Sequence, residues 1–208
     1  MEILKIHNNP ERAEWAALTE RFTRQEEEIT RQVAEILADV KSGGDRSLRE
    51  ITRRVEGRDP GTFEVPADVR AEAAALIPAA LKEALATAKT NIETFHRAQL
   101  APEVDTETMP GIRCVQRAVP IRRVGLYIPG GKAPLFSTVL MLAVPARVAG
   151  CGEVILCTPA HPDGTIAPEI LYAADLCGVD RIFSVGGAQA VAAMAYGTES
   201  IPRVDKIF

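Results

Sequence analysis

From Val124 onward, four short apolar runs mark the chain: VGLYI, EVILCT, RIFSV and VDKIF. Each is about five residues long and lacks polar alternation, which is typical of strands buried on both faces of a parallel sheet. The connecting stretches, residues 135–150, 167–177 and 188–196, are long enough for crossover helices. Strands and helices that alternate in this way predict βαβ units.

The first hundred residues follow a different period. From Pro10 to about Gly43 the sequence is rich in Glu, Arg, Ala and Leu and predicts an amphipathic helix. The three-to-four-residue spacing of such a helix is shown by Ile29, Val33, Ile36, Leu37 and Val40. The glycine pair at 43 and 44 ends it, since glycine adopts the left-handed conformation that closes a helix. Asp45 or Ser47 caps a second helix. A third helical region covers 66–99, with Pro78 in the first turn of its own segment.

Two further stretches complete the predicted organisation. The charged run QEEEITRQVAEIL is compatible with a coiled coil, but its apolar seam does not persist over three or four heptads. A helical layer packed on a larger body is therefore the preferred interpretation. Residues 101–123 read as irregular and then extended, which predicts a strand or hairpin used as a connector. The pattern as a whole predicts an α/β fold in which a mainly helical segment precedes a parallel sheet.

Composition is that of an ordinary soluble globular protein: 47% apolar and 25% charged residues, with a formal net charge of −4. Because there is no basic excess, we expect no nucleic-acid partner. The chain does not begin with the basic and apolar regions of a secretion signal. Its longest apolar stretch, Val139–Gly150, is far shorter than the roughly 20 residues that span a bilayer. We expect a cytoplasmic protein without membrane contact.

Cysteines and histidines show no metal-binding signature. The sequence has no CxxC pair, no histidine at zinc-finger spacing and no HExxH. The cysteines are interpreted as small buried hydrophobic residues in a reducing compartment. We therefore predict no metal site within this chain. The residues concerned are Cys114, Cys151, Cys157, Cys177, His7, His96 and His161.

Two glycine pairs follow predicted strands and are the first candidate chemistry: Gly130 with Gly131, and Gly186 with Gly187. In an open α/β sheet, ligands bind at the carboxyl ends of the strands, where helix N-termini present free N–H groups. Glycine permits a tight turn there and a close approach of an anionic group. Neither pair forms GxGxxG, and turn-forming glycines without a ligand explain each pair almost as well.

Two side chains beside these loops are the best placed to meet a cofactor. Tyr127 ends the first strand and could stack on a ring or bond to it, while Gln189, in the first turn of a helix, offers both a donor and an acceptor. The alternatives are a half-buried tyrosine and an exposed glutamine. Lys132 is a weaker candidate, because loop lysines are usually solvated. Asp205 has no evident partner in the sequence.

Two long runs resemble the histidinol dehydrogenase family. They are RVGLYIPGGKAPLFSTVLMLAVPARVAGCGEVILCTP and EILYAADLCGVDRIFSVGGAQAVAAMAYGTESIPRVDKIF, and the similarity is continuous from about Pro110 to Phe208. The resemblance implies an NAD-dependent, zinc-containing homodimer that oxidises L-histidinol through L-histidinal to L-histidine. It places Tyr127 and Gln189 at positions that contact NAD. The sheet region becomes an incomplete Rossmann-like domain.

The resemblance also implies a division of the chain: an extension with dimer contacts (1–22), the helical part of a first large domain (23–123) and an NAD-side domain cut at its end (124–208). Family members are about twice as long, and the family's zinc ligands and acid–base residues fall beyond Phe208. We therefore expect a fragment that lacks the catalytic half and is inactive alone. Two alternatives stay open: a dehydrogenase of another small alcohol, such as a sulfonated diol, and a non-catalytic coenzyme-binding or dimerisation module.

Overall fold

The structure, a computed structural model, describes residues 6–20, 26–130 and 133–208. The chain forms two compact units, Met1–Ala34 and Glu35–Phe208. In the first unit, a 3-10 turn (η1, Arg12–Glu14) leads into the short helix α1 (Trp15–Thr19), and neither contains a buried residue. Helix α2 (Glu26–Glu56) begins in the first unit and ends in the second.

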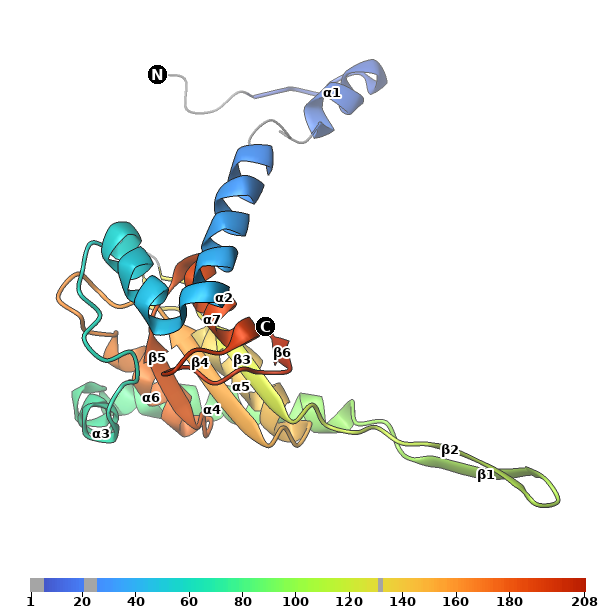
Figure 1. Cartoon of the computed structure of the whole chain (residues 1–208). Helices are drawn as coiled ribbons and strands as arrows, with labels where there is room; N and C mark the ends of the chain where they lie inside the picture. Colours follow the sequence, from blue (N-terminus) through green and yellow to red (C-terminus); the bar gives the residue numbers. More distant parts are fainter. Residues whose placement is uncertain (1–5, 21–25, 131–132) are drawn as a thin grey trace. The chain divides into compact units, whose positions relative to one another are not determined.

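A four-stranded parallel sheet forms the centre of the second unit (Figure 1). Its strands are β3 (Arg123–Tyr127), β4 (Glu153–Thr158), β5 (Arg181–Ser184) and β6 (Lys206–Ile207), in the order β5-β4-β3-β6. Numbered from the first strand of the sheet, this is the 3-2-1-4 part of the Rossmann strand order 3-2-1-4-5-6. The prediction of an incomplete Rossmann-like parallel sheet after a mainly helical segment is confirmed.

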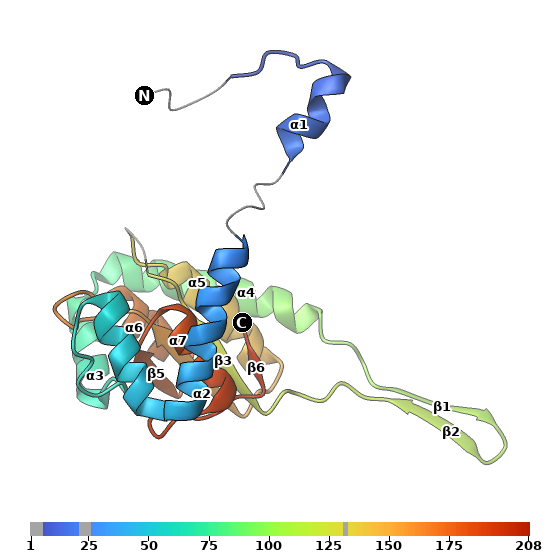
Figure 2. The ribbon, with the colours of Figure 1, turned by 45° about the horizontal axis from the view of Figure 1, so that its top comes forward.

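Helices cover both faces of the sheet, and each face has its own core (Figure 2). Helices α4 (Ala79–Ala98), α5 (Phe136–Val148) and α6 (Pro168–Leu176) pack on one face with the side chains of Leu126 and Leu156. Helix α7 (Gly187–Tyr196) and the second half of α2 pack on the other. Helix α3 (Ala67–Leu76) lies against α6. Burial on both faces explains why β3, β4 and β5 lack polar alternation. The predicted strand VDKIF differs: β6 lies at the edge of the sheet and is exposed to half-buried, so the prediction of burial on both faces is wrong there.

Helix α2 is kinked at Gly44, whose φ of 54° is the left-handed value expected of a helix-ending glycine. The helix resumes directly, and its new N-terminus is capped from a distant part of the chain. The backbone N–H of Asp45 donates to the Glu199 carboxylate at 2.7 Å, while the Asp45 carboxylate accepts from the N–H and hydroxyl of Ser200. The predicted cap residue therefore ties α2 to the loop after α7.

The predicted connector is a hairpin of β1 (Val104–Met109) and β2 (Ile112–Gln116), paired antiparallel. Figure 1 shows it extending away from the sheet. Every residue of both strands is exposed, including four large apolar ones. Among the residues described, no helix has both the length and the apolar character needed to cross a membrane.

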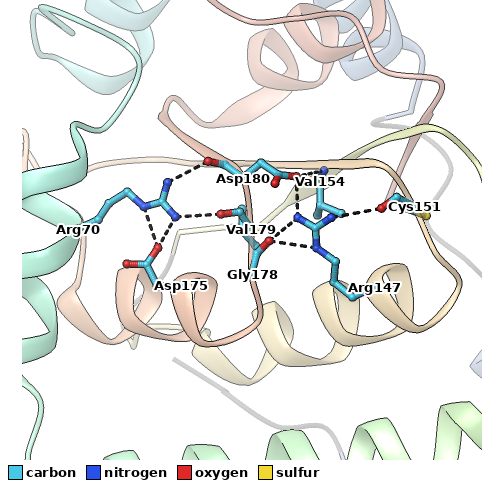
Figure 3. Close-up of polar contacts among 8 residues, drawn as sticks. All are labelled: Arg70, Arg147, Cys151, Val154, Asp175, Gly178, Val179 and Asp180. Atoms are coloured by element: carbon cyan, nitrogen blue, oxygen red, sulfur yellow. Dashed lines mark hydrogen bonds and ion pairs between the residues drawn. The ribbon is translucent and has the colours of Figure 1, made fainter.

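Two arginines fix the amino edge of the sheet (Figure 3). Arg147, near the end of α5, donates to the carbonyls of Gly178 and Cys151 and pairs with Asp180 at 2.6 Å. Asp180 also accepts from the N–H of Val154 at 2.7 Å, which joins the start of β4 to the start of β5.

Arg70 reaches the same turn from α3. Its guanidinium pairs with Asp175 and donates to the carbonyls of Val179 and Asp180, at 2.9 and 3.1 Å (Figure 3). The α6–β5 turn is thus held by side-chain donors from two helices, in addition to its own backbone bonds. Such bonds give hydrogen-bond donors to carbonyls that lie between the helix and the strand.

Candidate functional site

The loops that follow β3, β4 and β5 meet at Pro159. A Cβ atom on Gly130, after β3, would lie 2.6 Å from Pro159 Cγ, and one on Gly186, after β5, would lie 2.6 Å from Pro159 Cβ. The two predicted glycine loops therefore lie at one edge of the sheet and pack on a single proline ring. Both glycines have a packing reason that is independent of any ligand. Gly131 and Lys132 lie outside the described residues.

Tyr127 connects the two loops directly. Its hydroxyl accepts a hydrogen bond from the backbone N–H of Gly187 at 2.9 Å, so the end of β3 is tied to the first turn of α7. Gly187 has a φ of 65°, a conformation that side-chain-bearing residues rarely adopt. The tyrosine is half-buried, and its O–H can still donate. Gly130 and Gly187 are exposed beside it.

Gln189 is buried, with 1% of its surface exposed. Its side chain folds back over the start of α7, and a Cβ on Gly187 would come within 2.5 Å of Gln189 Oε1. The amide Nε2 lies 3.5 Å from Glu56 Oε1. The exposed glutamine weighed as an alternative is therefore wrong for this structure. A coenzyme contact by Gln189 stays a prediction, and it requires the side chain to be uncovered.

A largely buried ion pair, which the sequence did not reveal, lies against the loop between β5 and α7. Glu56, the last residue of α2, pairs with Arg58 at 2.9 Å, and the two side chains are only 11% and 4% exposed. Glu56 accepts from the N–H of Gly186 at 2.9 Å, and Arg58 donates to the carbonyl of Ser184 at 2.5 Å. Nothing in the local sequence marks Glu56 and Arg58, because the backbone groups that they bond lie about 130 residues further along the chain.

Two hollows adjoin this edge of the sheet. A groove of about 960 Å³ lies between α3 and α6 at the end of β5, with Arg58, Ser184 and His161 in its wall. None of the described coenzyme candidates lines it. A small cavity of about 80 Å³ lies beside Gly130 and is bordered by Thr158. The Thr158 hydroxyl is buried without a hydrogen-bond partner. A buried hydroxyl in this state is costly, and an ordered water is the usual remedy.

The described residues do not fit a zinc site. No three His, Cys, Asp or Glu side chains gather among them. All four cysteines are free thiols; three are buried as predicted, but Cys114, on β2, is exposed, which corrects that prediction. Burial raises the pKa of the Cys177 thiol to about 11 and raises that of Cys157 further. Protonated thiols are poor metal ligands.

The structure gives Asp205 a partner that is not evident in the sequence. It forms an ion pair with Arg123 at 2.9 Å and accepts from the Arg123 N–H at 3.2 Å. The arginine holds the pKa of Asp205 below its ordinary value. This contact lies at the amino ends of β3 and β6, away from the glycine loops. Register between distant strands brought the two residues together, which sequence spacing does not show.

Comparison with known proteins decides the family. The histidinol dehydrogenase family model matches residues 19–208. The chain belongs to the histidinol dehydrogenase family. It is 57% identical over 182 residues to a histidinol dehydrogenase of Escherichia coli O6:H1, covering 88% of this chain and 41% of that protein. It is 54% identical over 193 residues to the Salmonella typhi protein of the same name, covering 93% of this chain and 44% of that protein.

A solved structure agrees. The crystal structure of histidinol dehydrogenase from Elizabethkingia anophelis matches with a TM-score of 0.89 and 42% sequence identity, over 96% of this chain and 46% of that chain. The present chain therefore spans less than half the length of the relatives it matches. The resemblance inferred from the two long runs is confirmed at the level of the family.

Proposed function

We propose that this chain supplies the coenzyme-side part of a histidinol dehydrogenase, which oxidises L-histidinol to L-histidine through L-histidinal with two NAD. The observation that carries the proposal is the 57% identity, over 88% of this chain, to a protein of that name. NAD, when bound, accepts the hydride in each oxidation. Histidinol is the small-molecule substrate, and the compartment proposed is the cytoplasm.

Coenzyme contact is proposed for Tyr127, Gln189 and the two glycine pairs at 130–131 and 186–187. Its support is geometric. Gly130 and Gly187 leave backbone exposed at the carboxyl edge of the sheet, where α/β proteins bind nucleotides, and the Tyr127 hydroxyl lies between these loops. This surface fits a ligand that stacks and forms hydrogen bonds. The tyrosine ring orients the coenzyme, and the exposed glycines let it approach the backbone.

Three further proposals follow from family membership. Zinc is proposed for the whole enzyme, but no step is assigned to it here, because the described residues offer no ligand set. A homodimer is proposed, supported by exposed apolar side chains on the hairpin, such as Met109 and Ile112, since exposed apolar patches mark protein contacts. The divisions 1–22, 23–123 and 124–208 are proposed as an extension with dimer contacts, part of a first domain and the NAD-side domain.

A chimera tests the activity. Residues 19–208 would replace the matching segment of the Escherichia coli relative in a strain that lacks histidinol dehydrogenase and needs histidine. We expect growth without histidine, and loss of that growth on Tyr127→Ala. A chimera that accumulates as folded protein but forms no NADH from histidinol would contradict the proposal. Direct binding is tested by titrating NAD into the 208-residue chain in a calorimeter.

A further inference from the structure

The end of α2 places two opposite charges beneath the β5–α7 loop. Glu56 is the last helical residue, Gly57 has a φ of 69°, and this turn returns the chain so that Arg58 faces Glu56. Their side chains, 11% and 4% exposed, meet at 2.9 Å. Removing two charges from water is unfavourable unless their remaining polar atoms also find partners.

The remaining polar atoms find those partners in one place. Arg58 donates to the Ser184 carbonyl at 2.5 Å, and Glu56 Oε1 accepts from the Gly186 N–H at 2.9 Å. The pair therefore holds the backbone on both sides of Val185. Bonds between a charged group and a backbone dipole are among the stronger ones in proteins. The path of the chain from β5 into α7 is set by α2, not by the loop alone.

The same carboxylate orients Gln189. Oε1 of Glu56 accepts from Gln189 Nε2 at 3.5 Å. A carboxylate can only accept hydrogen bonds, so it attracts the amide N–H₂ of Gln189 and not the amide oxygen. The oxygen of Gln189 is then turned toward Gly187, whose N–H is held by the Tyr127 hydroxyl. Glu56 is thus bonded to Gly186 and Gln189, and the adjacent Gly187 is bonded to Tyr127.

We propose that Glu56 and Arg58 are positioning residues for coenzyme binding: they fix the Ser184–Gly186 backbone and the amide orientation of Gln189. The inference rests on the proposed function, because it names the groups that prepare that site. Neither residue is assigned a contact with the coenzyme. A bare structural ion pair would stabilise the fold without setting the affinity for NAD.

The test compares Glu56→Gln and Glu56→Ala with the control Arg53→Gln, in the 208-residue chain. Arg53 pairs with Asp59 on the same segment, but that pair is exposed and does not touch the β5–α7 loop. Two quantities are measured: amide hydrogen exchange of Gly186 by NMR without coenzyme, and the Kd for NAD by calorimetry. The N–H of Ile128, bonded to the Cys157 carbonyl, serves as the reference for global opening.

We expect Gly186 exchange to rise in both Glu56 variants while Ile128 stays protected. The Kd for NAD should rise about tenfold in Glu56→Ala, as for one lost charged hydrogen bond. Glu56→Gln should lie between Glu56→Ala and the parent, because its amide keeps an acceptor oxygen but presents N–H groups to Arg58. If Glu56→Ala does not fold, the Glu56→Gln variant still tests the inference. Arg53→Gln should change neither quantity.

Three results would overturn the inference. Unchanged Gly186 exchange would show that Glu56 does not hold the loop. Raised exchange with an unchanged Kd would show that it holds the loop without preparing the site. If the parent chain binds no NAD, the proposed coenzyme role of the loop fails and the positioning role fails with it, whereas the exchange data still report separately whether the loop is held.

Discussion

The two edges of the parallel sheet are held by charged side chains that differ in their exposure to water. At the amino edge, Arg70 and Arg147 reach inward from helices and bond to carbonyls of the α6–β5 turn (Figure 3). Their side chains are 17% and 29% exposed, so water still reaches them. At the carboxyl edge, Glu56 and Arg58 are largely buried and bond to the backbone of Gly186 and Ser184.

The difference teaches where each edge can meet a ligand. The donors of the amino edge are already used on the protein's own carbonyls, so this edge serves folding. At the carboxyl edge the ion pair bonds to the buried part of the loop, Ser184 and Gly186, while Gly130 and Gly187 stay exposed. Support placed under a loop fixes its geometry without covering the face that a ligand would use.

The largest effect is expected at the buried pair. Arg58→Met leaves the Glu56 carboxylate buried without its cation, which should lower the free energy of unfolding by about 3 kcal/mol. Urea denaturation followed by circular dichroism measures it. The control Arg53→Gln, which breaks an exposed pair, should change it by less than about 0.5 kcal/mol. If the free energy of unfolding fell equally in Arg58→Met and Arg53→Gln, the buried ion pair would contribute no more than the exposed one.

Arg147→Met should have the next largest effect, about 2 kcal/mol, because it removes several bonds to the α6–β5 turn at a side chain that is less than a third exposed. Its control is Arg113→Gln on the exposed hairpin, where the ion pair with Asp105 should contribute little. The same denaturation experiment applies. If Arg147→Met weakened NAD binding more than it weakened folding, the two edges would not have separate roles.

Gly130→Ala and Gly186→Ala test the packing on Pro159. Each added methyl group meets the proline at 2.6 Å and should destabilise the chain by about 1 to 2 kcal/mol. Adding Pro159→Ala should rescue Gly130→Ala, whose clash is with Cγ, but not Gly186→Ala, whose clash is with Cβ. Thermal unfolding of the single and double variants measures this. Rescue of both, or of neither, would contradict the stated geometry.

The smallest effect concerns pH. Arg123 lowers the pKa of Asp205 below its ordinary value of 3.8. The stabilisation is therefore fully present above that value and is lost as pH falls through the lower folded pKa. Both side chains are 39% exposed, so the change should be small. Asp205→Asn should therefore make the free energy of unfolding less dependent on pH between roughly pH 5 and pH 2. An unchanged acid slope would show that the pair does not contribute.

Much of the fold was predictable because it depends on local patterns. Strands buried on two faces need unbroken apolar runs, and the helix end at Gly44 needs a residue that tolerates positive φ. The candidate site was only half predictable. Tyr127 ends β3 and the glycine pairs follow β3 and β5, so the sequence shows them. Pro159, on which both glycine loops pack, directly follows β4 and was a signal that strand-end reasoning could have used.

By itself, the sequence determined the order of strands and helices, the edge of the sheet on which the glycine loops lie, and the family. Only the tertiary structure decided that Gln189 is buried, that Asp205 pairs with Arg123 and that Glu56 and Arg58 hold the β5–α7 loop. The physical reason is distance along the chain. Periodicity records whether a side chain faces the core, but the partner of a buried charge is set by packing between elements that lie far apart in sequence.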